Sequence, residues 1–417
     1  MAPGNFDPLM MSDPASRPAI ARLPLVLRWL FLGATLGAAL LATAQRPAHF
    51  EHPQADLVRA QELFDMAQYG AARSVCDQFV ARTRDPHDPA RIEAEYYAAI
   101  CAVRLYNDDA SNRLLAFLDA HPENFRVPAI NLELFRHYFN LKRWPDALAY
   151  AKEVDPNGLG TAERDEFVFK KGYALFQQDQ PDAALPEFAK VKDGTSAYAP
   201  SATYYTAHIH YTRRNYEAAL LGFEKLGNDE AFGKVVPYYI AQIRFLKGDY
   251  NALLEYAKPL LADPDGAKRT GDINRLAGEA YYRTGQYKEA QPYLEKSLQR
   301  AGVERSDRYV AGYVFYQNGE YKRALDQLNQ VAAPAGKPAE DSLAQMAAYH
   351  MADCYLKLNE KNYARNAFKR AYDLNKDPRI TEDALFNYAK LAYELSFDPY
   401  NEAVIALRDY MKAYPNS

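Results

Sequence analysis

Several residue types that mark common protein classes are scarce in this sequence. Only three cysteines occur among 417 residues, which excludes a small scaffold held together by many disulfides. Neither sign of charge is in large excess, because 50 Lys and Arg stand against 54 Asp and Glu, a net charge of −4. The two signs are interspersed, so no basic patch marks a nucleic-acid surface. We therefore expect no nucleic-acid partner.

The three cysteines, Cys76, Cys101 and Cys354, fall on apolar helical faces at positions that favour small residues. A free cysteine in such a place behaves as a small hydrophobic residue, so we interpret all three as part of the core. Cys76 and Cys101 lie in segments that we expect to be neighbours, and a bridge between them stays open as an alternative.

Motifs of catalytic, cofactor and metal sites are also missing. The sequence has no P-loop, no G-x-G-x-x-G after a strand, no G-x-S-x-G and no H-E-x-x-H, the patterns that would place a nucleophile, a phosphate or a zinc ion. His208 and His210 come nearest to a metal pair, but side chains two apart on a helix point about 200° away from each other. We expect no enzyme activity, no cofactor and no metal site.

Long apolar runs are absent except near the N-terminus. Three arginines, at positions 17, 22 and 28, precede an apolar run over residues 29–41, and residues 42–44 form an Ala-x-Ala cleavage signal. The run is shorter than the ~20 residues of a transmembrane helix, so residues 1–44 are typical of a secretory signal peptide. We expect cleavage after Ala44, a linker over residues 45–53, and a location in the periplasm or at the cell surface. The mature protein should be soluble and should meet membranes only through a partner.

A repeated spacing is the dominant feature of what is present. A small residue is followed twelve residues later by Ala, and four residues after that by a large apolar residue. The clearest copies are Gly172/Ala184/Phe188, Ala207/Ala219/Phe223, Gly278/Ala290/Leu294, Gly312/Ala324/Leu328 and Ala352/Ala364/Phe368. The small positions 172, 207, 241, 278, 312, 352 and 389 are 35, 34, 37, 34, 40 and 37 residues apart. Self-similarity at this period predicts an array of helical hairpins.

The glycines in this pattern predict specific structure. Gly costs about 1 kcal/mol relative to Ala inside a helix, so Gly172, Gly278 and Gly312 need a packing reason, namely the close approach of the second helix of the hairpin. Between the two helices, Gly248, Gly285 and Gly319 precede a polar residue and a tyrosine. At these positions we expect a left-handed residue that ends the first helix.

The segments LAGEAYYRTGQYKEAQPYLEKSL from Leu276 and VAGYVFYQNGEYKRALDQLNQV from Val310 closely resemble the tetratricopeptide repeat (TPR) family. The resemblance implies an all-α fold, a right-handed α-solenoid of about ten TPR-like hairpins. Residues 54–165 are similar only in a degenerate way; the hairpin at Trp144, for example, has Phe135 where the small residue belongs. Residues 166–417 fit better. The last hairpin has two extra turn residues, 398–399, and an apolar final helix without a polar cap. We expect the sequence to be a fragment of a longer array; an edge covered by a partner or by self-association is the alternative.

The resemblance also implies that the first helix of each hairpin lines a concave groove. On these helices, aromatic residues seven apart fall on one helix face, beside a line of mixed polar residues. The candidate protein-binding residues are Tyr173, Tyr204, His208, Tyr211, Tyr238, Gln242, Glu279, Tyr282, Tyr309, Tyr313, Tyr316, Tyr349 and Asp353. Packing between helices is the alternative role of the tyrosines, and we favour it for most of them, with the hydroxyl tips exposed.

These observations predict a non-catalytic TPR scaffold of the bacterial envelope. Its concave groove would bind protein or peptide partners, in assembly, secretion or trafficking; this rests on family analogy. Two alternatives stay open. One is a carbohydrate-binding envelope protein that stacks aromatic faces on sugar rings, and the other is the TPR arm of a longer enzyme whose catalytic part lies beyond residue 417.

Overall fold

The computed structural model describes residues 54–263, 265, 267–395 and 402–415. Within these residues every regular element is helical, and twenty α-helices follow one another as hairpins. The all-α repeat prediction is therefore confirmed. The predicted signal peptide and linker, and the extra turn residues 398–399, lie outside the described residues. The chain divides into two compact units, one up to Tyr198 and one from Ala199.

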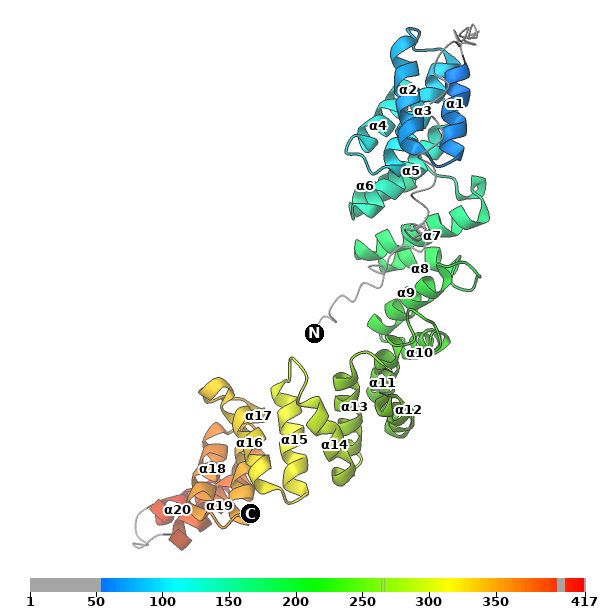
Figure 1. The fold of residues 1–417 in the computed structure, drawn as a ribbon. Coiled ribbons are helices and arrows are strands. Elements are labelled where there is room, and N and C mark those ends of the chain that lie inside the picture. The colour runs from blue at the N-terminus through cyan, green and yellow to red at the C-terminus, as the bar shows by residue number, and fades with distance from the viewer. Residues whose placement is uncertain (1–53, 264, 266, 396–401, 416–417) are drawn as a thin grey trace, which may run out of the picture. The chain divides into compact units, whose positions relative to one another are not determined.

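The N-terminal unit holds four hairpins, with odd-numbered first helices and even-numbered second helices (Figure 1). Its elements are α1 (Ala55–Asp65), α2 (Tyr69–Arg82), α3 (Pro89–Arg104), α4 (Ala110–Ala120), α5 (Val127–Asn140), α6 (Trp144–Ala151), the 3₁₀ turn η2 (Pro156–Gly158), α7 (Thr161–Gln177) and α8 (Pro181–Ala189). The division at 165/166 between degenerate and regular repeats falls inside α7 and stays a prediction.

The C-terminal unit continues the same alternation with six hairpins. Its elements are α9 (Ala199–Thr212), α10 (Tyr216–Lys225), α11 (Val236–Lys247), α12 (Tyr250–Ala262), α13 (Thr270–Arg283), α14 (Tyr287–Ser297), α15 (Arg305–Gln317), α16 (Tyr321–Ala332), the 3₁₀ turn η3 (Pro334–Gly336), α17 (Ser342–Lys357), α18 (Lys361–Leu374), α19 (Pro378–Leu395) and α20 (Glu402–Ala413). No helix in the described part of the chain is both long enough and apolar enough to cross a membrane.

The small residues of the first helices lie against the large residues sixteen positions later, as the repeat predicts. A Cβ atom placed on Gly278 would lie 2.7 Å from Leu294 Cγ, and one on Gly312 would lie 2.9 Å from Leu328 Cγ. Such distances leave no room for a side chain. The alanines between them in the sequence, Ala184, Ala219, Ala290, Ala324 and Ala364, are all fully buried. The packing reason expected for the helical glycines is therefore confirmed.

A second recurring contact joins the last turn of a first helix to the first residue of its second helix. In each case two aromatic rings five residues apart meet at an angle. The pairs and their centroid distances are Phe64–Tyr69 (5.4 Å), Phe139–Trp144 (5.3 Å), Tyr211–Tyr216 (6.3 Å), Phe245–Tyr250 (5.6 Å), Tyr282–Tyr287 (6.3 Å) and Tyr316–Tyr321 (6.0 Å). Many of the abundant aromatic residues thus close hairpins.

The turn inside each of the first nine hairpins has one residue with positive φ. Glycine occupies it in three hairpins, at Gly248, Gly285 and Gly319, as predicted. The other six hairpins use a residue with a side chain, namely Ala67, Tyr106, Lys142, Asp179, Arg214 and Asn359. The left-handed conformation is a requirement of the hairpin, since it persists where the residue disfavours it.

Successive first helices touch one another within each unit. Contacts join α1 to α3, α3 to α5 and α5 to α7, and likewise α11 to α13, α13 to α15, α15 to α17 and α17 to α19. The backbones of successive second helices in the described hairpins lie farther apart, and these helices meet through side chains such as those of the ion pairs Arg113–Asp77 and Arg323–Glu295. Each unit therefore has an inner face formed by its first helices, in agreement with the groove that the repeat resemblance implies.

The three cysteines are free and buried, so their interpretation as core is confirmed and the Cys76–Cys101 bridge is not formed. Burial raises the pKa of Cys76 to about 12, that of Cys101 to about 11 and that of Cys354 to about 12. These thiols are protonated at neutral pH and are poor nucleophiles.

The close approach at Gly312 predicts a penalty for any side chain there. Gly312→Val should lower the free energy of unfolding by about 1–3 kcal/mol, because the added methyl groups would overlap Leu328. Urea denaturation followed by circular dichroism measures the loss, and amide hydrogen exchange should locate it in α15 and α16. Gly70→Ala is the control, since no atom lies within 4 Å of its Cβ position; an equal loss in both variants would contradict the packing role.

The turn geometry predicts a stabilising substitution. Ala67 is exposed and has φ 57°, so Ala67→Gly should raise the free energy of unfolding by about 1 kcal/mol through relief of the left-handed strain. Ala71→Gly, at an exposed position inside α2, should instead lower it by a similar amount. A loss of stability in both variants would show that Ala67 is not strained.

Candidate functional site

The inner face of the N-terminal unit contains a cavity of about 860 Å³. Its walls are the C-terminal end of α3, the turn from α3 to α4, one side of α5 and the first half of α7. A volume of this size is within the range of ligand and peptide sites. It is the candidate site that the fold positions best, because three successive first helices contribute to it.

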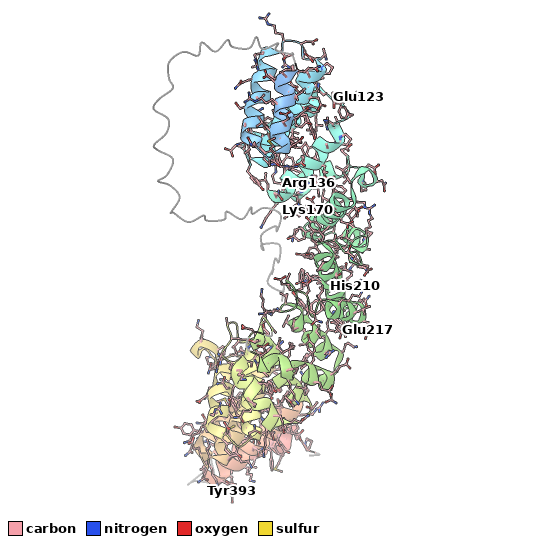
Figure 2. The ribbon with its side chains drawn as sticks, turned by 45° about the vertical axis from the view of Figure 1, so that its right-hand side comes forward. Glu123, Arg136, Lys170, His210, Glu217 and Tyr393 are labelled. Carbon is pink, nitrogen blue, oxygen red and sulfur yellow. The ribbon has the colours of Figure 1, made fainter. Side chains whose placement is uncertain are left out.

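A ladder of ion pairs crosses the wall of this cavity from α3 to α7. Arg104 donates from Nη1 and Nη2 to the two Glu133 oxygens at 3.0 and 2.9 Å, and Arg136 Nη1 donates to Glu133 Oε1 at 2.8 Å. Arg136 also donates to Glu166, from Nε to Oε1 at 3.2 Å and from Nη2 to Oε2 at 2.6 Å. Lys170 Nζ donates to Glu166 Oε1 at 2.7 Å. Figure 2 shows Arg136 and Lys170 together at this place. Bidentate guanidinium–carboxylate pairs of this kind fix the register between neighbouring helices.

The ladder keeps its members charged although they are partly buried. Burial alone would raise the pKa of Glu166, but the hydrogen bonds and positive charges of Arg136 and Lys170 lower it below its usual value. Burial would likewise lower the pKa of Arg136, and the Glu166 and Glu133 carboxylates raise it instead. His137, which also lines the cavity, has its pKa lowered by burial and then by Arg143, so it is neutral at pH 7.

The rim of the cavity differs from its wall. Tyr106 in the turn after α3 is 82% exposed, and Leu141 at the end of α5 is 55% exposed. Both carboxylates of the ladder already accept hydrogen bonds from Arg or Lys, so neither is poised to take a proton from a substrate. The arrangement is suited to holding a polypeptide segment, with apolar contacts at the rim and fixed charges behind them.

The predicted groove residues differ in how far they are buried. Tyr173, Tyr204, Tyr238 and Tyr309 are buried, with 2, 2, 8 and 6% exposure. The half-buried members are His208, Tyr211, Gln242, Glu279, Tyr282, Tyr313, Tyr316, Tyr349 and Asp353. Packing is thus the observed role of the first four, and partner binding by the half-buried set stays a prediction. The expectation of exposed hydroxyl tips is wrong for Tyr204, whose buried hydroxyl donates to Tyr239 Oη at 3.3 Å.

Several predicted residues come together in the C-terminal unit. Four tyrosines surround His350, and Tyr309, Tyr313, Tyr316 and Tyr349 have ring centroids 6.0, 4.9, 5.9 and 5.4 Å from it. Tyr204, His208 and Tyr211 form a second cluster around Tyr239. Tyr173 belongs to neither cluster, because it lies in the N-terminal unit against Phe139 and Trp144.

The ion-pair ladder was not predicted. One signal for it was available, since Glu163, Glu166 and Lys170 are three and four residues apart and so share a helix face. Their partners on α3 and α5 depend on the register between hairpins, which the repeat period does not specify. Among the described residues, no group of three or more His, Cys, Asp or Glu side chains is arranged to hold a metal ion.

Comparisons with known proteins agree with the repeat architecture. Residues 283–371 match the family model for the anaphase-promoting complex, cyclosome, subunit 3, and residues 383–417 match a tetratricopeptide repeat model. No curated protein matches the sequence.

Solved structures similar to this chain include three repeat proteins. One is a tetratricopeptide repeat protein from Parabacteroides merdae, with 12% identity, 63% of this chain and 98% of that chain covered, and a TM-score of 0.39. Another is the C-terminal part of a TPR repeat-containing protein from Cytophaga hutchinsonii, with 13% identity, 66% and 99% coverage and a TM-score of 0.38. The third is the TPR domain of P58(IPK), with 14% identity, 83% and 99% coverage and a TM-score of 0.28.

The ladder predicts a pH-dependent loss of stability when its central residue is removed. Arg136→Met should lower the free energy of unfolding at pH 7 by about 2–3 kcal/mol, because Glu133 and Glu166 each lose a partner while partly buried. The pKa of Glu166 is lowered in the folded protein, so its contribution is present above its ordinary pKa and disappears as the pH falls through the lowered value. The difference between wild type and variant should therefore shrink below about pH 4.

Urea denaturation at pH 7 and pH 3 measures this difference. Arg82→Met is the matched control, because Arg82 and its partner Asp56 have side chains 60 and 40% exposed and an exposed pair contributes less than about 1 kcal/mol. A loss that is equal at both pH values would show that Arg136 acts through packing alone.

Proposed function

This chain is a tetratricopeptide repeat protein, and from that premise we propose that it is a non-catalytic scaffold that binds protein partners along its first helices. Repeat arrays of stacked helix pairs present extended concave surfaces to their ligands. Here the first helices form the inner face of each unit, since their backbones approach one another more closely than those of the second helices in the described hairpins. That contact pattern is the observation that carries the proposal.

The burial of the tyrosine rings supports a protein ligand over a glycan. Stacking on sugar rings needs exposed aromatic faces, whereas the rings of the His350 cluster are engaged with one another. What the first helices leave exposed is a mixture of polar and apolar side chains, such as Gln317, Leu246 and, on α19, Phe386 and Tyr393. Such a surface suits a polypeptide, which brings both kinds of group.

The compartment is part of the proposal. The arginines, apolar run and Ala-x-Ala motif of residues 1–44 have the features of a signal peptide. We therefore place the scaffold in the periplasm or at the cell surface, with a role in envelope assembly, secretion or trafficking. Its partners are proteins of that compartment, and any membrane association occurs through them.

Two exposed leucines provide a matched test of the binding face. Leu246 lies on the first helix α11 and is 47% exposed, and Leu221 lies on the second helix α10 and is 63% exposed. Leu246→Glu should reduce the capture of partner proteins from crosslinked envelope fractions at least about tenfold, because it puts a charge in a desolvated contact. Leu221→Glu should leave the capture unchanged.

Quantitative mass spectrometry of the captured proteins compares the two variants with wild type. Loss of the same partners in Leu221→Glu alone would move the binding face to the second helices. Unchanged capture in both variants would contradict a partner contact at this part of the inner face.

A further inference from the structure

We propose that the cavity of the N-terminal unit binds a lysine or arginine side chain of a partner polypeptide, together with an apolar neighbour. This inference rests on the proposed scaffold function and names the chemistry of the segment that the scaffold would hold. The cavity is the space lined by α3, the α3–α4 turn, α5 and α7 of the N-terminal unit.

The charges that line the cavity favour a cationic ligand. Four carboxylates, those of Asp108, Glu133, Glu163 and Glu166, are set against three cationic side chains, those of Arg104, Arg136 and Lys170. The only histidine in the lining, His137, has a lowered pKa and adds no charge at pH 7. The surplus is therefore negative.

Because the ladder pairs Glu133 and Glu166, the surplus negative charge lies on the two remaining carboxylates, those of Glu163 and Asp108. Glu133 and Glu166 are saturated by Arg104, Arg136 and Lys170. Glu163 is 52% exposed and reaches Arg136 only at 3.4 Å, while Arg136 already holds Glu166 at 2.6 Å and Glu133 at 2.8 Å.

Asp108 is exposed in the turn before α4. Within the described part of the chain, its carboxylate has no hydrogen bond or ion pair. The carboxylates of Asp108 in the α3–α4 turn and of Glu163 on α7, which both line the cavity, thus have capacity left for a cation.

The rim also offers the apolar surface that a long basic side chain needs. Tyr106 has positive φ, 55°, and its ring is 82% exposed beside the cavity, so it can face a guanidinium or ammonium group. Leu141 on the α5 side is 55% exposed and can pack against the methylene stem or an adjacent apolar residue. About 860 Å³ of space accommodates a basic side chain with its neighbour.

An anionic ligand is the poorer fit. An incoming carboxylate or phosphate would compete with Glu133 and Glu166 for Arg104 and Arg136, because each of these carboxylates is held by bidentate bonds. Displacement would leave a partly buried carboxylate without its partner, which is strongly unfavourable. A cation disturbs none of these pairs.

Short synthetic peptides test the inference. The probes are one neutral host sequence with a central Leu-Arg, Leu-Lys, Leu-citrulline or Leu-Glu pair, titrated into the full chain and followed by fluorescence anisotropy. We expect the Arg and Lys peptides to bind at least about fivefold tighter than the citrulline and Glu peptides. The double variant Asp108→Asn/Glu163→Gln should weaken the Arg peptide about five- to tenfold and remove the preference.

Asp119→Asn/Glu123→Gln is the matched control, because it removes two exposed carboxylates of the same unit that do not line the cavity; Figure 2 shows Glu123 away from Arg136 and Lys170. Equal binding of all four peptides, no detectable binding, or an unchanged preference in Asp108→Asn/Glu163→Gln would overturn the inference. If that variant also still captures envelope partners while Leu246→Glu does not, the scaffold function stands and only the basic-ligand assignment is wrong. If neither variant affects the capture, the captured partners contact neither the cavity nor α11.

Discussion

The structure depends on one contact that recurs in the hairpins, the close approach of a small residue on the first helix to a large residue on the second. Where the small residue is glycine, as at Gly278 and Gly312, the facing leucine leaves no space for a Cβ atom. Each hairpin still has an apolar face to bury, so stability comes from stacking on its neighbours. In this stacking the first helices of the described hairpins approach one another more closely than the second helices do, so the first helices form the inner face.

The side chains that join neighbouring first helices differ in kind between the two units. In the N-terminal unit the inner face is held by the paired charges of Arg104, Glu133, Arg136, Glu166 and Lys170. In the C-terminal unit, contacts between aromatic rings join the first helices instead, most clearly around His350. The proposed basic ligand would meet the first surface at Asp108, which has no ion pair among the described residues, and at Glu163, which Arg136 holds only at 3.4 Å. The second surface has its tyrosines committed largely to packing, so its exposed contacts are the residues between the rings.

Much of the fold could be predicted from spacing, because spacing reflects contacts within one hairpin. Gly172 with Phe188 and Gly278 with Leu294 are such contacts, and the left-handed Gly285 and Gly319 are local turn chemistry. What could not be predicted depends on register between hairpins. Phe135, which stands where a small residue belongs, is fully buried and packs against Phe167 of the next first helix at 5.0 Å. The burial of Tyr204 and the pairing of Arg136 with Glu166 also depend on this register. The burial of side chains and the ion pairs along the groove therefore could not be predicted from the sequence.

We propose that polypeptide partners bind the first helices. Amide hydrogen exchange of the full chain, with and without a captured partner, tests it most directly because it reports every hairpin at once. A partner on the first helices should slow exchange near the C-terminal ends of odd-numbered helices, such as α3, α5 and α11, and leave even-numbered helices unchanged. Protection confined to even-numbered helices would contradict it, since the partner would then lie on the opposite face of the hairpins.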